Sequence, residues 1–218
     1  NADQLKEQAA RAAVALIEAG MTVGLGTGST AAHAVRALGE RVASGLSIVG
    51  VPTSQQTEAQ ARGLGISLAE LDEVDHLDIT IDGADEIDLA SFSVIKGFGG
   101  ALLREKLVAR ATVRQVIIGD GGKVSARGLT KVVPVEVVPF GARHTARALE
   151  RLGARPVLRE GGGAPFVTDG GNRIYDCDSA RIAAAIKALP GVVDHGLFID
   201  LVHTIIVAGD DGVRTYRR

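Results

Sequence analysis

The stretch Thr22-Val23-Gly24-Leu25-Gly26-Thr27-Gly28-Ser29-Thr30 decides the fold of this chain. Residues 22–25 predict a strand, the glycines predict a tight turn, and the apolar residues from 31 to 42 recur at helical spacing. A strand that passes through a short turn into a helix is the repeating unit of mostly parallel sheets. The stretch therefore predicts an α/β fold, with the turn at the carboxyl end of its strand.

The same alternation continues on both sides of this stretch. A helix over 5–17 precedes it and stops near Gly20, and a capping box of Thr53 with Gln56 predicts a third helix that ends near Gly63. A further helix covers about 101–110. Further strands are expected at 48–51, 66–68, 77–81 and 115–118. This order predicts crossover units and a mostly parallel sheet.

The rhythm changes after about Gly128. Extended segments are expected at 132–138, 156–159, 166–168, 173–177 and 192–198, and helices at 142–152 and 179–189. The order β-α-β-β-α-β, with one split strand, is the ferredoxin-like pattern. The last stretches, 204–207 and 213–216, can return to the first sheet. We therefore expect one domain made of 1–130 and 204–218, and a smaller α+β domain over 131–203.

Composition excludes several classes of protein. The formal net charge is −2 and there are only two Tyr, five Phe and no Trp, so the chain has neither the charge nor the stacking surface to hold nucleic acid. The lone Cys177 excludes an intramolecular disulfide and a Cys-based zinc site, and it fits a reducing compartment. The longest uncharged run, 19–35, is too short and too polar to span a membrane, and the N-terminal residues do not form a secretory signal. We expect a cytoplasmic protein without nucleic-acid or membrane partners.

Glycine is the outlier, with 28 of the 218 residues, and the glycines gather in loops at strand ends. The loop 24–30 leads into a helix N-terminus, whose N–H groups and hydroxyls suit a phosphate. It is not a Walker A loop, because no Lys precedes Ser29, and Ser29 also breaks the dinucleotide fingerprint. The alternative is a tight turn with a Ser/Thr cap.

A second glycine-rich loop is Gly119-Asp120-Gly121-Gly122-Lys123. Its Lys123 is either a second phosphate contact or an ordinary surface lysine.

Two further loops carry charged residues. Asp82-Gly83-Ala84-Asp85-Glu86-Ile87-Asp88 crowds four carboxylates at a strand end, which indicates a functional cluster or, alternatively, an Asp-Gly turn followed by a solvated helix start. In the stretch from Lys96-Gly97-Phe98-Gly99-Gly100 to Arg104-Glu105-Lys106, the glycine loop can offer backbone N–H groups to an anionic oxygen. The alternative for its last three residues is an exposed charged helix face.

Taken together and in this order, the four segments resemble the type A ribose-5-phosphate isomerases, over nearly the whole chain. The resemblance implies a Rossmann-like, mostly parallel α/β domain with an inserted smaller ferredoxin-like α+β domain. It implies interconversion of D-ribose 5-phosphate and D-ribulose 5-phosphate, in the non-oxidative branch of the pentose phosphate pathway, with no metal or organic cofactor. It also implies a homodimer or homotetramer, so the small domain is assigned to assembly.

The resemblance also implies roles for individual residues. Glu105 is the proton acceptor. The substrate, mainly its phosphate, is held by Thr27, Gly28, Ser29, Thr30 and Lys123. The sugar is lined by Asp82, Gly83, Ala84, Asp85, Lys96, Gly97, Phe98 and Gly99.

The chemistry explains why these residue types are needed. One carboxylate near both C1 and C2 can move a proton between them through an enediol, which is the role of Glu105. Lys96 and nearby loop N–H groups can stabilise the oxyanion of that intermediate. The substrate enters mostly as a closed furanose, so a second acid/base must open the ring. Asp82 is the candidate, and Asp85 positions hydroxyls.

Two residues depart from the family pattern, and three other functions compete. Phe98 stands in the glycine loop where a smaller residue is common, and Gly122 stands where a hydroxyl residue is common. A sugar-phosphate sensor would need a DNA-binding segment, for which the first strand near Thr22 leaves no room. A deaminase or lactonase on a related fold would lack the Lys96 loop combined with Glu105. A nucleotide-binding module lacks its fingerprint glycine and Walker lysine.

Overall fold

The computed structural model describes residues 1–178 and 183–218, and its centre is a six-stranded sheet. The strands lie in the order β15-β14-β6-β3-β1-β2. Their bounds are β1 (Thr22–Leu25), β2 (Val49–Pro52), β3 (Leu77–Gly83), β6 (Thr112–Asp120), β14 (Thr204–Gly209) and β15 (Gly212–Arg217). All neighbours are parallel except the edge strand β15. This confirms the mostly parallel sheet and the return of the last stretches to it.

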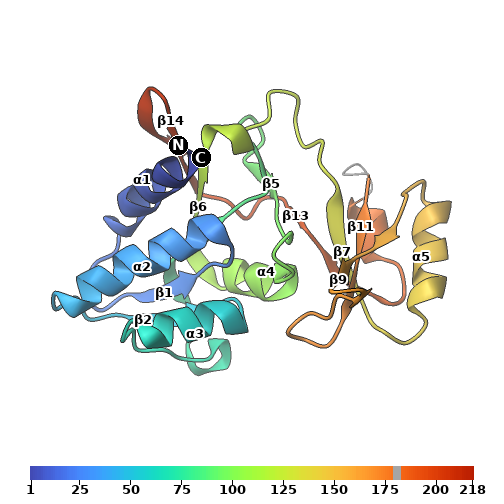
Figure 1. Cartoon of the computed structure of the whole chain (residues 1–218), viewed down its shortest axis with the longest axis horizontal. Coiled ribbons are helices and arrows are strands. Elements are labelled where there is room, and N and C mark those ends of the chain that lie inside the picture. Colours follow the sequence, from blue (N-terminus) through green and yellow to red (C-terminus); the bar gives the residue numbers. More distant parts are fainter. Residues whose placement is uncertain (179–182) are drawn as a thin grey trace.

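Helices and a small second sheet cover the two faces of this sheet (Figure 1). Residues of α1 (Ala2–Val14) and α2 (Ser29–Ala43) share one core with Val116 and Ile118 of β6. Ile117, between those two, packs on the opposite face with Ala109 of α4 (Leu102–Arg110). Successive residues of a strand point to opposite faces, so a strand covered on both sides is apolar throughout. A third helix, α3 (Gln55–Gly63), packs on α2 and β2.

A three-stranded sheet that the sequence did not indicate follows β3. It is formed by β4 (Glu86–Asp88), β5 (Ser93–Ile95) and β13 (Leu197–Phe198), in the order β13-β5-β4. The carboxylate cluster therefore continues into a strand, and not into a solvated helix start. This sheet places Lys96 at the end of β5.

The second part of the chain forms a separate four-stranded antiparallel sheet in the order β12-β7-β11-β8 (Figure 1). Its elements are β7 (Val133–Val137), α5 (Ala142–Arg151), β8 (Val157–Leu158), β11 (Arg173–Cys177), α6 (Ala183–Lys187) and β12 (Val192–His195). A short hairpin of β9 (Glu160–Gly161) and β10 (Ala164–Pro165) projects from it. This element order confirms the ferredoxin-like pattern. Of the expected helix over 179–189, residues 179–182 lie outside the described residues.

Two of the expected strands are wrong. Of 66–68, only Leu68 makes an isolated bridge, to Gly50. The segment 166–168 forms no strand: it follows the β9–β10 hairpin and leads into a turn in which Thr168 N–H donates to the Asn172 carbonyl and Gly171 N–H donates to the Thr168 carbonyl.

Two further expectations needed correction at single residues. The strand expected over 192–198 breaks at Gly196, which passes so close to Lys96 that a Cβ on Gly196 would lie 2.1 Å from the Lys96 carbonyl oxygen. The chain there leaves β7 and joins β5. The cap of the third helix is Ser54, whose hydroxyl accepts from Thr57 N–H, while the Thr53 hydroxyl bonds the Leu25 carbonyl instead.

The described residues also include two short 3-10 helices, η1 (Leu71–Glu73) and η2 (Gly121–Lys123). None of the helices in the described ranges is both long and apolar enough to cross a membrane.

Candidate active site

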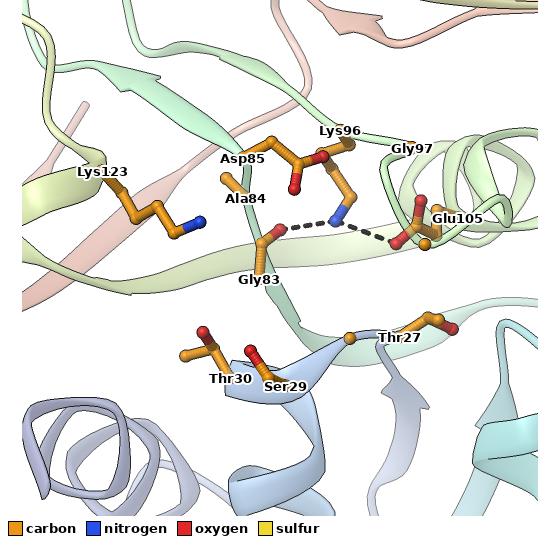
Figure 2. Close-up of a pocket in the computed structure, with 12 residues that line it drawn as sticks. Thr27, Ser29, Thr30, Gly83, Ala84, Asp85, Lys96, Gly97, Glu105 and Lys123 are labelled. Carbon is orange, nitrogen blue, oxygen red and sulfur yellow. Dashed lines mark hydrogen bonds and ion pairs between the residues drawn. The ribbon is translucent and has the colours of Figure 1, made fainter. Parts of the chain in front are cut away.

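A pocket lies where the connections of two adjacent strands separate. β1 and β3 are neighbours, but the chain after β1 returns to β2 on one side, whereas the chain after β3 reaches β6 on the other. Ligands of open α/β sheets bind at such a switch point, beyond the carboxyl ends of the strands. The pocket is lined by Thr27, Gly28, Ser29, Thr30, Gly83, Ala84, Asp85, Lys96, Gly97, Gly99, Glu105 and Lys123 (Figure 2). Of the predicted site residues, Asp82 and Phe98 are outside this lining.

The loop after β1 approaches β3 too closely for any side chain at Gly26. A Cβ there would lie 2.2 Å from Asp82 Oδ1. Gly28 has a φ of 106° and precedes the N-terminus of α2, where Ser29 and Thr30 reach the pocket (Figure 2). Unpaired N–H groups at a helix start favour an anion.

The side chain of Thr27 turns away from the pocket (Figure 2). Its hydroxyl lies 2.7 Å from that of Thr53 and 2.8 Å from that of Ser54, in a buried network that ties the loop to the start of α3. The Thr27 hydroxyl, which was expected to bind substrate, is therefore engaged in hydrogen bonds within the protein. Other atoms of Thr27 line the pocket.

Lys96 is the centre of a buried charged cluster. Its Nζ lies 3.0 Å from Asp82 Oδ2 and 3.1 Å from Glu105 Oε1, and it donates to the Gly83 carbonyl (Figure 2). Burial opposes the charge of Lys96, but the carboxylates of Asp82 and Glu105 outweigh it and raise the pKa of the ammonium. The centre of the Phe198 ring lies 5.7 Å from Lys96 Nζ.

Glu105 stands in the first turn of α4 and is only 4% exposed. One of its oxygens contacts Lys96, and within the described part of the chain the other, Oε2, has no hydrogen-bond partner. Burial raises the pKa of Glu105 to about 8, against the lowering effect of Lys96. A carboxylate held in this way can take a proton near neutral pH.

Asp82 and Asp85 lie differently. Asp82 is fully buried behind Gly83, and its Oδ1 accepts from the N–H groups of Thr27 and Gly83 at 3.1 and 2.8 Å. Burial raises the pKa of Asp82 despite the nearby Lys96. Asp85 lines the pocket, and its Oδ2 accepts from Phe98 N–H at 3.0 Å.

The alternative interpretation of Arg104-Glu105-Lys106, an exposed charged helix face, is wrong at two of the three residues. Glu105 and Lys106 are both buried. Lys106 Nζ donates to Asp194 Oδ1 at 2.7 Å and lies 4.9 Å from the centre of the Phe198 ring. Phe98, by contrast, is 43% exposed, so the bulky residue of the glycine loop does not fill the pocket.

The opposite end of the pocket gathers cationic and hydroxyl groups. Lys123 reaches in from η2, across from Ser29 and Thr30 (Figure 2). Lys6 of α1 donates from Nζ to Ser29 Oγ at 3.1 Å, which brings a second cation beside this end. Sequence reasoning missed Lys6, because a single lysine on a polar helix face carries no local signal.

The described residues contain no group of three or more His, Cys, Asp or Glu side chains that could hold a metal ion.

Known proteins are similar to this chain over nearly its whole length. A family model described as Ribose 5-phosphate isomerase A (phosphoriboisomerase A) matches residues 49–212. The chain is 53% identical over 224 residues to the ribose-5-phosphate isomerase A of Thermomicrobium roseum, with 99% of this chain and 94% of that protein covered. The corresponding protein of Gloeobacter violaceus is 54% identical over 218 residues, with 97% and 95% covered.

Solved structures of the same family superpose closely on this chain. The ribose 5-phosphate isomerase A of Methanocaldococcus jannaschii superposes with a TM-score of 0.94 at 37% identity, over 99% of both chains. A D-ribose-5-phosphate isomerase in complex with phospho-erythronic acid also gives 0.94, at 35% identity over 100% of both chains.

Proposed function

The chain belongs to the ribose 5-phosphate isomerase A family and is an aldose-ketose isomerase of D-ribose 5-phosphate and D-ribulose 5-phosphate, and from this premise we propose that Glu105 moves the proton between C1 and C2. The observation that carries the proposal is the buried carboxylate of Glu105 in the pocket wall. Lys96 holds one of its oxygens at 3.1 Å, and Oε2 has no partner in the described part of the chain. Oε2 is buried in the pocket wall, so no hydrogen bond within the described residues competes with the proton transfer proposed for this carboxylate.

The reaction transfers one proton and shifts one double bond. Glu105 takes the proton from C2 of the open-chain aldose, and the electron pair forms the C1–C2 double bond of an enediolate as negative charge collects on O1. O1 is then protonated, O2 loses its proton, and C1 receives the proton that Glu105 carries, which leaves the C2 ketone. Reversal of these steps gives the aldose.

Lys96 and the glycine loop supply the charge stabilisation. The ammonium of Lys96 lies between Asp82 and Glu105, so a fixed positive charge is present where the enediolate forms. Gly97 and Gly99 line the pocket beside it, where loop N–H groups can reach an oxyanion. Fixed donors of this kind act without reorganisation during the reaction.

Ring opening needs an acid/base near the furanose. Of the two aspartates, Asp85 lines the pocket, whereas Asp82 is fully buried. We therefore place Asp85 in contact with the sugar, and Asp82, the candidate from sequence, acts through Lys96, whose ammonium it holds at 3.0 Å.

The phosphate belongs at the end of the pocket formed by Gly28, Ser29, Thr30 and Lys123, with Lys6 beside it. The relative solved with phospho-erythronic acid supports this placement, because that compound carries a phosphate at one end and a carboxylate at the other. The cationic ends of this pocket, Lys123 and Lys96, match those two charges.

The test is isomerisation of ribose 5-phosphate by the purified protein with EDTA present, comparing the wild type with Glu105→Gln. The amide cannot accept the proton, so we expect kcat to fall by about 10³-fold or more, with KM changed little. Glu150→Gln, an exposed helix residue of α5, is the matched control and should keep full activity. Near wild-type turnover by Glu105→Gln would remove Glu105 from this role. Substrate binding without turnover by the wild type would favour a sensor.

We also propose how the chain is organised. Residues 1–130 and 204–218 form the catalytic domain, and 131–203 form the smaller domain, which has its own core around Val135, Leu149 and Tyr175. The smaller domain serves assembly into a homodimer or homotetramer. The protein works in the cytoplasm, in the non-oxidative branch of the pentose phosphate pathway.

A further inference from the structure

We propose that Arg159, in the smaller domain, is a positioning residue that sets the shape of the glycine loop 97–100. Its Nη1 donates to the Gly97 carbonyl at 2.8 Å and to the Phe98 carbonyl at 3.1 Å. Both carbonyls belong to the loop beside Lys96 and Glu105. The inference rests on the proposed function, because it gives the loop a role in binding the enediolate.

The guanidinium of Arg159 is itself fixed. Nε donates to Asp176 Oδ2 at 3.0 Å and Nη2 donates to Oδ1 at 2.5 Å, so the carboxylate of β11 holds two sides of the fork. The Arg159 side chain is 14% exposed. The planar guanidinium makes all four of these hydrogen bonds in a fixed geometry, whereas a lysine ammonium has only three donors and no planar fork.

Phe166 holds the other end of the loop. Its ring centre lies 5.9 Å from Cζ of Arg159, and its backbone N–H donates to the Arg159 carbonyl at 2.9 Å. The ring also sits directly against Gly100, where a Cβ would come within 2.3 Å of it. Arg159 therefore contacts the start of the loop and Phe166 contacts its end, both from the smaller domain.

These contacts determine where the N–H groups of the loop point. The C=O and N–H of a trans peptide point in opposite directions. With the Gly97 carbonyl turned to Arg159, the N–H of Phe98 faces Asp85, to which it donates at 3.0 Å. With the Phe98 carbonyl turned the same way, the N–H of Gly99 faces the opposite side, and Gly99 lines the pocket. The smaller domain thus orients the donors that the oxyanion uses.

The experiment compares kcat and KM of the wild type with those of Arg159→Ala, Arg159→Lys and Arg155→Ala. Arg155 is the matched control. It forms an ion pair with Asp178 in the same domain, and its side chain is 87% exposed. We expect Arg159→Ala to lower kcat by about 10- to 100-fold with KM changed less than about threefold, because misplaced donors weaken the transition state. Arg159→Lys should not restore kcat, and Arg155→Ala should match the wild type.

Added methylguanidine separates positioning from folding. It should recover part of the kcat of Arg159→Ala and leave Arg155→Ala unchanged, because the small cation can bind Asp176 and the two carbonyls. Unchanged kcat in Arg159→Ala, an equal loss in Arg155→Ala, or a loss that methylguanidine does not relieve would overturn the proposal. Should Arg159→Ala not fold, Asp176→Asn is measured instead, and wild-type kcat in that variant would also overturn it. Failure of the proposed function shows differently, as full activity in Glu105→Gln.

Discussion

At the scale of single residues, the site depends on one cation shared by two buried carboxylates. Asp82 and Glu105 are 0% and 4% exposed, and each contacts Lys96 Nζ within 3.1 Å. Buried carboxylates without a cation would take up protons. Lys96 lowers the pKa of both carboxylates, but burial outweighs it and raises the pKa of Glu105 to about 8. A carboxylate with such a pKa is a stronger base than one in water.

The pH dependence of kcat/KM should report this raised pKa. Glu105 accepts a proton only when ionised, so kcat/KM should fall about tenfold per pH unit below about 8, the pKa of the free enzyme. Steady-state rates from about pH 6 to about pH 9.5 measure it. Because the charge of Asp82 raises the pKa of Glu105 and that of Lys96 lowers it, Asp82→Asn should move the midpoint to lower pH and Lys96→Met to higher pH. A flat profile below pH 8 would contradict the assignment.

At the scale of elements, the proposed phosphate end of the pocket combines two structures that follow different strands. The start of α2 contributes Ser29 and Thr30, and η2 after β6 contributes Lys123. The Asp120 side chain accepts from Gly122 N–H at 3.0 Å and fixes the start of η2. Gly122 therefore has a backbone role where the family pattern would place a hydroxyl.

Loss of Lys123 should affect binding more than chemistry. The phosphate does not change during the reaction, so Lys123→Ala removes an interaction shared by ground state and transition state. We expect KM to rise about tenfold, with kcat changed less than about threefold and inhibition by inorganic phosphate weakened. Arg127→Ala, an exposed cation of the same segment outside the pocket lining, is the control for general electrostatics. An unchanged KM in Lys123→Ala would count against the phosphate assignment.

At the scale of the whole molecule, the two parts of the chain meet at the glycine loop. Arg159 and Phe166 of the smaller domain contact the loop, and Lys106 of α4 contacts Asp194 of β12. Glu105 and Lys106 are adjacent in α4. Glu105 lines the pocket, and Lys106 contacts the smaller domain, so α4 links the two.

The oligomeric state is the prediction at this scale. If the smaller domain serves assembly, light scattering should give two or four times the 22.5 kDa of one chain. Sedimentation velocity at several concentrations checks whether the assembly is stable. A single 22.5 kDa species at working enzyme concentrations would contradict the proposed homodimer or homotetramer.

The sequence by itself determined the α/β fold and the position of most of the pocket. Periodicity of apolar residues is local, so the alternation of strands and helices could be predicted from stretches such as 22–30. In a parallel sheet the carboxyl ends of neighbouring strands share one edge, so loops far apart in the chain had to meet there. Glycine in such a loop also has a physical reason. Gly26 lies so close to Asp82 that no side chain would fit there.

Only the tertiary structure decided which charged groups are buried and what holds them. Nothing local distinguishes Glu105 and Lys106 from an exposed helix face, yet both are buried by Lys96, Asp194 and Phe198. The break at Gly196 likewise depends on the passing carbonyl of Lys96. Arg159 binds a loop 62 residues away in the chain. Such contacts arise from packing between distant segments, and the periodicity of either segment alone does not contain them.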